Sequence, residues 1–297
     1  MAAISQGDRE KQSAAGYSLL TAIALAGIKT VAGLLTGSLG ILAEAAHSGL
    51  DLVAAIMTFL AVRISGKPPD TDHLYGHGKV ENLSALFETA ILLLTCVWIV
   101  RESIGRLLHH QGRMEVNVWS FTVMLVSIAA NAVRSRALAR TAKKYDSQAL
   151  EADALHFQTD IWSSVVVVFG LIAVKIADAS PRLDWLRGGD ALAALGVSAL
   201  IVLVSVRLGR RTIDALLDSA PAGMEQRIAK AAEGVAGVHN CHRVRIRASG
   251  PKMFVDLHVL VDGGQTLAQA HDLTDRIEAA ILEIAPQADV TVHPEPL

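Results

Sequence analysis

The chain has 297 residues, of which 52% are hydrophobic and only 19% are charged. This composition is too apolar for an ordinary soluble domain and is typical of a protein with several membrane-spanning helices. The formal net charge of −2 argues against a nucleic-acid partner, since no basic surface accumulates. The two cysteines, Cys96 and Cys241, lie in segments of different character, so no disulfide framework is expected.

A polar segment, residues 1–13, comes first and carries no cleavable signal pattern, so we expect a cytoplasmic N-terminal tail. Six apolar stretches follow, each with about the 20 residues that a helix needs to cross a bilayer. They predict an α-helical membrane domain over residues 14–211. The predicted spans comprise residues 14–36, 39–63, 82–108, 116–138, 150–177 and 190–208.

The loops differ in their basic residues. Lys and Arg are more frequent after the second, fourth and sixth spans than in the intervening loops. Loops rich in Lys and Arg stay on the cytoplasmic side of a membrane. The bias predicts that both termini are cytoplasmic, in a protein of the cell (inner) membrane. The short uncharged link at residues 36–38 predicts an antiparallel hairpin of the first two spans.

From about Thr212 to residue 297 the composition becomes that of a small soluble domain. Residues 224–233 and 266–284 have the apolar spacing of helices. Alternation of apolar and polar residues predicts strands, with a hairpin turn at 249–251. The order helix, strand, strand, helix, strand predicts an α+β unit with its helices on one face of the sheet. The predicted strands comprise residues 241–247, 252–261 and 288–293.

Two histidine–aspartate pairs lie in the predicted spans, His47 with Asp51 in the second and His156 with Asp160 in the fifth. The four-residue spacing puts both side chains of a pair on one helix face. Ionisable side chains inside a membrane are costly and indicate function. Two imidazoles and two carboxylates suit a tetrahedral divalent metal, Zn²⁺ first. A structural hydrogen bond between helices explains one such pair more readily than two.

The same four groups predict exchange of metal for protons. Two ionised aspartates and one divalent cation sum to zero charge, which a membrane interior tolerates. Protons compete with metal for these ligands, and the ordinary histidine pKa of about 6.5 puts the competition in the physiological range. Glu44 lies on the same face as His47. Two interpretations of Glu44 stay open, a carboxylate on the ion's access path and a residue at headgroup level.

Two further groups of metal-ligating residues lie outside the spans. In the loop after the second span, Asp70, His73 and His77 have a spacing that suits a three-ligand zinc site as well as a solvated loop. The second group lies in the tail and comprises His242, His258, His271 and His293 with Glu295 nearby. Scattered surface histidines are the simpler explanation of this tail group, and Cys241 is more simply a small thiol than a ligand.

Motifs of other protein classes are missing from the sequence. It contains no phosphate-binding glycine loop, no dinucleotide fingerprint and no H-E-x-x-H segment. Nucleotide-driven transport and zinc protease activity within this chain are therefore not expected, and we predict a secondary active transporter rather than an enzyme. A passive divalent-cation channel and a membrane-anchored metal sensor stay open as alternatives.

With these motifs in place, the chain resembles the cation diffusion facilitators, a family of zinc and iron exporters. The resemblance runs from about Tyr17 to Pro294 and rests on residues 37–51, 73–81, 152–160 and 255–258. It implies a homodimer with six spans per subunit, alternating access with proton antiport, and a metallochaperone-like (ferredoxin-like) cytoplasmic domain. The expected partners are a second subunit, the lipid bilayer, divalent ions and protons, without nucleic acid or nucleotide.

The resemblance also assigns residues to sites. The implied transport site is His47, Asp51, His156 and Asp160, and the implied loop site is Asp70, His73 and His77. The implied tail site for paired metals is His242, His258, His271 and His293, with Glu295 where bacterial relatives often carry Asp. Lys79 matches a lysine that forms a charge lock between subunits, with Asp218 as its acidic counterpart.

One departure from the family pattern bears on metal choice. Relatives that move zinc, iron or cadmium often carry Asp at the position of His47. Histidine there removes one negative charge and adds a softer nitrogen ligand, which favours Zn²⁺ over Mn²⁺. Fe²⁺, Cd²⁺ and Co²⁺ stay open as alternative substrates.

Overall fold

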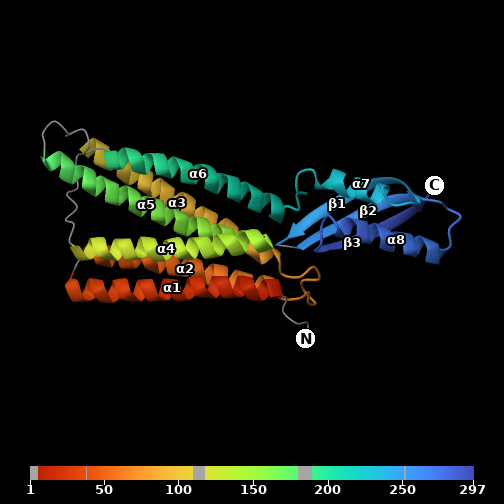
Figure 1. Ribbon diagram of the computed structural model, residues 1–297, viewed down its shortest axis with the longest axis horizontal. Helices are drawn as coiled ribbons and strands as arrows, with labels where there is room; N and C mark the ends of the chain where they lie inside the picture. Colours follow the sequence, from red (N-terminus) through yellow and green to blue (C-terminus); the bar gives the residue numbers. More distant parts are fainter. Residues whose placement is uncertain (1–5, 38, 110–117, 180–188, 251) are drawn as a thin grey trace.

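A computed structural model describes residues 6–37, 39–109, 118–179, 189–250 and 252–297. Long helices form an elongated bundle at one end of the molecule, and a small α+β domain lies at the other (Figure 1). The helical membrane domain and the α+β tail expected from the sequence are both present. The bundle helices are α1 (Gln6–Thr36), α2 (Leu39–Ser65), α3 (Lys79–His109), α4 (Val118–Tyr145), α5 (Gln148–Ala179) and α6 (Gly189–Leu216).

Three helical segments in the described part of the chain are long and apolar enough to cross a membrane, namely Gln6–Leu35, Ala45–Ser65 and Lys79–Gly105. They coincide with the first three predicted spans. Helix α4 carries Asn131 and several arginines, and α5 and α6 flank residues 180–188, which lie outside the described part. Six crossings therefore remain a prediction.

Helices α1 and α2 form the hairpin predicted for the first two spans and lie side by side along the bundle (Figure 1). Gly37 in the link has a φ of 63°, a left-handed conformation that glycine adopts without steric cost. The helices approach closely, because a Cβ added to Gly33 would lie 2.8 Å from Leu42 Cδ2. Of the two ligand candidates on α2, Asp51 is buried in the bundle and His47 is half-buried.

At the end of the bundle nearest the tail, a buried carboxylate, Glu81 at the start of α3, joins several helices. Its side chain accepts hydrogen bonds from Lys11 Nζ at 2.9 Å and from Ser65 Oγ at 2.8 Å. Ser147, just before α5, also donates to it. A buried charge is tolerated when it is paired and hydrogen-bonded, and these contacts connect α1, α2 and α3 at one point.

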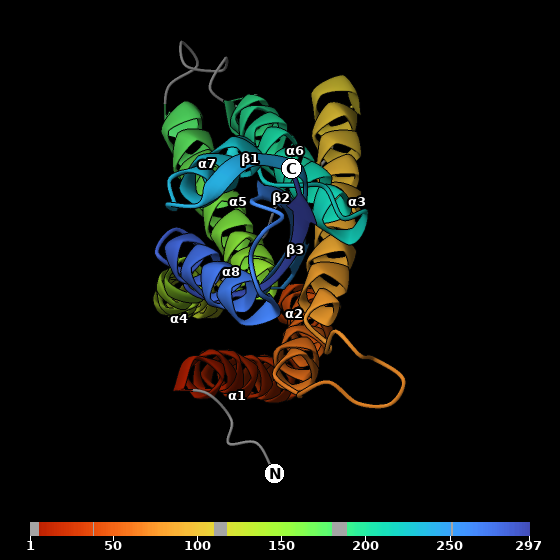
Figure 2. The ribbon, with the colours of Figure 1, turned by 90° about the vertical axis from the view of Figure 1, so that its right-hand side faces the viewer.

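The tail consists of α7 (Met224–Glu233), β1 (Val238–Ser249), β2 (Lys252–Val261), α8 (Leu267–Leu282) and β3 (Ala288–Pro296). The strand order is β1-β2-β3, with β1 antiparallel and β3 parallel to β2. Both helices lie on the same side of the sheet (Figure 2). Alternation along β2 buries Val255, Leu257 and Val259 against them, so His258 lies on the open face. Helix α6 runs past Thr212 to Leu216, beyond the predicted start of the tail.

The tip of the β1–β2 hairpin packs against the start of α3. The Gly250 amide donates to Asn82 Oδ1 at 3.3 Å, and a Cβ on Gly78 would lie only 2.1 Å from Ser249 O. Beside this joint, the Tyr75 ring lies 3.6 Å from the Arg247 guanidinium and meets a phenylalanine of β2 edge-on. Membrane domain and tail are thus in direct backbone contact.

Candidate metal sites

The structure brings together the two histidine–aspartate pairs, one on α2 and one on α5. His47 Nε2 lies 3.6 Å from Asp160 Oδ1 and 3.9 Å from Asp51 Oδ1. His156 Nε2 lies 3.2 Å from Asp51 Oδ1 and 3.9 Å from Asp160 Oδ2. Each imidazole therefore faces a carboxylate of its own helix and one of the other helix. The i, i+4 spacing accounts for the first contact, and the crossing of α2 and α5 accounts for the second.

Burial makes this cluster costly unless it is compensated. Asp51 and His156 are buried, with 7% and 4% of their surface exposed. Asp160 Oδ2 is buried and has no hydrogen-bond partner among the described residues. A buried oxygen without a partner loses its hydration, and a bound cation restores that interaction. The donor set of ring nitrogens and carboxylate oxygens suits a divalent metal carried as substrate.

Charged residues that the sequence reasoning left without a role surround the cluster. Lys29 Nζ donates to Ser48 Oγ at 2.9 Å, directly beside His47. Arg134 of α4 and Asp153 of α5 are fully buried as well. In the sequence, each of the two appears as a charged residue within an apolar helical pattern. Arg134 also fits the basic segment that follows the fourth predicted span, which hides this signal.

The loop between α2 and α3 forms a second cluster. Asp70 Oδ1 lies 3.3 Å from His73 Nδ1, and Asp70 Oδ2 lies 3.1 Å from His77 Nε2. The His73 backbone amide donates to Asp70 at 2.7 Å and is the main cause that lowers the pKa of the Asp70 carboxyl. A carboxylate held ionised between two imidazoles can serve as a metal ligand, so the three-residue set is geometrically ready for an ion.

The third cluster lies on the open face of the tail sheet. Glu295 Oε1 lies 2.8 Å from His258 Nδ1, and Glu295 Oε2 lies 3.2 Å from His242 Nε2. His293 Nε2 is 3.8 Å from the same carboxylate. The hydrogen bond with His258 is the main cause that lowers the pKa of Glu295. The longer glutamate arm thus reaches the histidines, as a ligand at this position must.

Two tail residues lie apart from this cluster. His271 is exposed on α8, which packs against the opposite face of the sheet, so it does not join the other histidines within one chain. Cys241, by contrast, points into the core of the tail, and burial raises the pKa of its thiol to about 11. Thiolate is the metal-binding form, which makes Cys241 a core residue rather than a ligand.

The remaining predicted residues are Lys79, Asp218 and Glu44. Lys79 Nζ lies 2.8 Å from Asp218 Oδ1 and donates to Leu216 O at 3.3 Å. Within this one chain the two residues pair with each other, and the expected lock between subunits stays a prediction. Glu44 belongs to α2, but its side chain lies outside the described ones.

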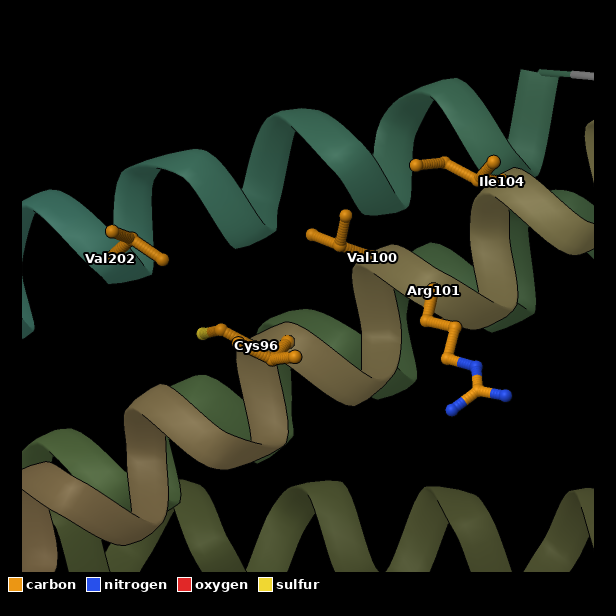
Figure 3. A pocket seen from close by; sticks show the side chains of 6 residues that line it. Cys96, Val100, Arg101, Ile104 and Val202 are labelled. Atoms are coloured by element: carbon orange, nitrogen blue, oxygen red, sulfur yellow. The ribbon is translucent and has the colours of Figure 1, made fainter.

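A hollow in the bundle shares no residue with the three clusters. It has a volume of about 420 Å³ and lies between α3 and α6 (Figure 3). Its lining is apolar apart from Arg101, whose guanidinium points away from α6 (Figure 3). The hollow is lined by Cys96, Val97, Val100, Arg101, Ile104 and Val202. It contains no set of metal ligands.

Comparison with solved structures finds matches to about a quarter of the chain. A MamM CTD structure is 31% identical and covers 25% of this chain and 94% of its own, with a TM-score of 0.24. A cadmium form of MamM CTD is 27% identical and covers 26% of this chain and 96% of its own, with a TM-score of 0.25.

Comparison with known sequences covers nearly the whole chain. Residues 16–217 match the cation efflux transmembrane domain, and residues 220–297 match the cation efflux protein cytoplasmic domain. The cation-efflux pump FieF of Pectobacterium carotovorum is 33% identical over 267 residues, covering 88% of this chain and 85% of the relative. The uncharacterized transporter sll1263 of Synechocystis is 33% identical over 286 residues, covering 94% and 88%. The chain therefore belongs to the cation diffusion facilitator (cation efflux) family of membrane transporters.

Proposed function

We propose that this protein exports Zn²⁺ across the cell (inner) membrane in exchange for protons, by alternating access. The observation that carries the proposal is the cluster of His47, Asp51, His156 and Asp160, in which Asp51 and His156 are buried. It supplies two nitrogen and two oxygen ligands from two helices of the bundle. An ion bound there contacts both helices, so a relative movement of α2 and α5 can open the site to one side at a time.

Zinc is the proposed substrate because of the donor set. Zn²⁺ accepts mixed nitrogen and oxygen ligands in tetrahedral geometry, whereas Mn²⁺ prefers more oxygen ligands. His47 faces both carboxylates, at 3.9 Å from Asp51 and 3.6 Å from Asp160. At this position His47 supplies a nitrogen ligand, where relatives often supply a carboxylate oxygen. Fe²⁺, Cd²⁺ and Co²⁺ remain the nearest alternatives, since similar ligands also hold these ions.

Proton exchange follows from the chemistry of the same ligands. A metal binds imidazole and carboxylate in their deprotonated forms, so protons that enter from the outer side displace it. The emptied site then returns inward carrying protons. The two carboxylates and one divalent ion have a net charge of zero. Without metal or protons the site carries the uncompensated negative charge of both carboxylates, which is costly in a membrane. The cycle thus couples export of metal to inward movement of protons.

The tail provides the proposed control. Its open sheet face carries His242, His258 and Glu295 within mutual reach, and we assign this face to metal binding and to contact with a second subunit. Metal in the tail shifts the conformational equilibrium only if one state binds it more tightly than the other. We assign the loop cluster of Asp70, His73 and His77 as a further metal site at the joint between the domains.

The test is zinc flux into vesicles that contain the purified full chain, with and without a pH gradient. Asp51→Asn and Asp160→Asn should each abolish flux, whereas Asp275→Asn on the exposed face of α8 should leave it unchanged. Unchanged flux in the first two variants would sink the proposal. Flux that ignores the pH gradient would instead indicate a passive channel. Zinc-dependent association of tails without any flux would indicate a sensor.

A further inference from the structure

Arg134 of α4 is a buried charge inside the bundle. Only 1% of its surface is exposed. Its Nη2 and Nε atoms lie 2.9 and 3.3 Å from Ser18 Oγ on α1, and its guanidinium lies 3.6 Å from the centre of the Phe157 ring on α5. An arginine remains protonated in proteins, so this position holds a permanent positive charge.

A buried carboxylate accompanies this charge. Asp153 of α5 has no exposed surface and accepts a hydrogen bond from Ser18 Oγ at 3.0 Å. The Ser18 hydroxyl therefore accepts from Arg134 and donates to Asp153, which links three helices through one oxygen. Burying a single charge at such a place is costly, whereas opposite charges held by a shared hydrogen-bonding group compensate each other.

Both charges lie beside the transport cluster, the set formed by His47, Asp51, His156 and Asp160. Asp153 precedes His156 by one helical turn, and Phe157, on which Arg134 rests, directly follows His156. Arg134 and Asp51 line the same small cavity of about 10 Å³, which has room for about one water molecule. The other residues around this cavity are Ala22, Leu25, Lys29, Ser48 and Asn131. The guanidinium charge thus acts on the cluster across a short, poorly hydrated path.

We propose that Arg134 is a fixed positive charge that limits how tightly the transport cluster holds its cation, and that Asp153 is the opposing negative charge. The proposal rests on the proposed function of the cluster as a metal site. Asp51 and Asp160 balance a divalent ion, so the charges of Arg134 and Asp153 act in addition to that balance. A carried ion must bind well enough to enter the site and weakly enough to leave it.

The Coulomb interaction predicts that neutralising Arg134 and neutralising Asp153 change the affinity for Zn²⁺ in opposite directions. Arg134→Gln removes a repulsive charge and should tighten zinc binding by about tenfold or more, and Asp153→Asn should weaken it by a similar factor. The double variant should return to within a few-fold of the parent. Damage to packing would instead weaken binding in both single variants. In vesicles, Arg134→Gln should lower both KM and the maximal rate, because release becomes slow, whereas Asp153→Asn should raise KM.

The measurement is calorimetric titration with Zn²⁺ of the full chain in detergent. All variants are made in one parent protein, which carries Asp70→Ala and His258→Ala so that the loop and tail clusters do not bind Zn²⁺. Arg136→Gln, at an exposed position on the same helix, is the matched control and should bind like the parent. Arg134→Lys keeps the charge and should also bind like the parent, so it tests the proposal even if the glutamine variant does not fold.

Two results would overturn the proposal. One is weaker binding in both Arg134→Gln and Asp153→Asn, and the other is an Arg134→Lys variant whose affinity departs from the parent by tenfold. Failure of the parent itself to bind Zn²⁺ is a different outcome. That result would refute the assignment of the four-residue cluster as a metal site, and with it the proposed function.

Discussion

Replacing Gly78 with alanine should separate the tail from the membrane domain. Gly78 lies at the end of the loop before α3, where the chain meets the tip of the β1–β2 hairpin. A methyl group at this position would lie 2.1 Å from Ser249 O and 2.6 Å from Ser249 C. Both are backbone atoms, so no change of side-chain rotamer can relieve the clash.

The size of the effect follows from these distances. Ordinary contact begins at 3.4 Å, so the hairpin tip must move by more than 1 Å. This movement breaks the hydrogen bond from the Gly250 amide to Asn82 and pulls Arg247 from the ring of Tyr75. Overpacking of this kind costs about 1–3 kcal/mol, and a cation–π contact contributes about 0.5–1 kcal/mol. The joint should therefore open while each domain stays folded.

Hydrogen exchange of the full chain can measure this opening. The Gly250 amide should exchange about tenfold or more faster in Gly78→Ala, whereas amides in the centre of β2 should keep their rates. Gly27→Ala is the matched control, because nothing lies within 4 Å of a Cβ added there. If the Gly250 amide were equally protected in Gly78→Ala and in wild type, the reasoning from close approach would be wrong.

Two further predictions concern charged pairs outside the membrane domain core. Glu295→Gln should destabilise the metal-free protein at neutral pH, because the hydrogen bond with His258 lowers the pKa of Glu295 below its ordinary value of 4.5. That stabilisation is present above pH 4.5 and is lost as the pH falls through the lowered pKa, so denaturation midpoints of the two proteins should converge in acid; a constant difference would contradict this. Lys79→Ala and Asp218→Ala should each cost less than about 1 kcal/mol in denaturant unfolding, because the pair is exposed. The charge-exchanged double variant should recover most of that loss, and no recovery would show that the pairing itself contributes nothing.

The helices and strands could be predicted from the sequence because they depend on the periodic spacing of apolar residues that are near one another in the chain. Alternation and helical spacing predicted the tail's order of helices and strands, and the helix at Met224–Glu233 has the predicted bounds. The apolar runs predicted a helical membrane domain for the same reason. The spacing of His47 with Asp51 and of His156 with Asp160 likewise followed from a helical repeat. These features depend only on residues that are close together in the sequence.

Contacts between distant segments depended on packing. No local pattern shows that α2 and α5 cross where their histidines and aspartates lie, or that Arg134 and Asp153 share the hydroxyl of Ser18. The family resemblance supplied the first of these contacts and not the second.

The tail shows the same division between local and distant information. The family resemblance grouped His271 with the other tail histidines, but within one chain α8 lies on the opposite face of the sheet. Lys79 and Asp218 lie far apart in the sequence, and the close approach of α3 and the segment after α6 pairs them within one chain, while a lock between subunits stays a prediction. The sequence alone thus determined the elements, the ligand types and the family. The tertiary structure decided which side chains meet, because that depends on how helices and sheet pack to exclude solvent and compensate buried charge.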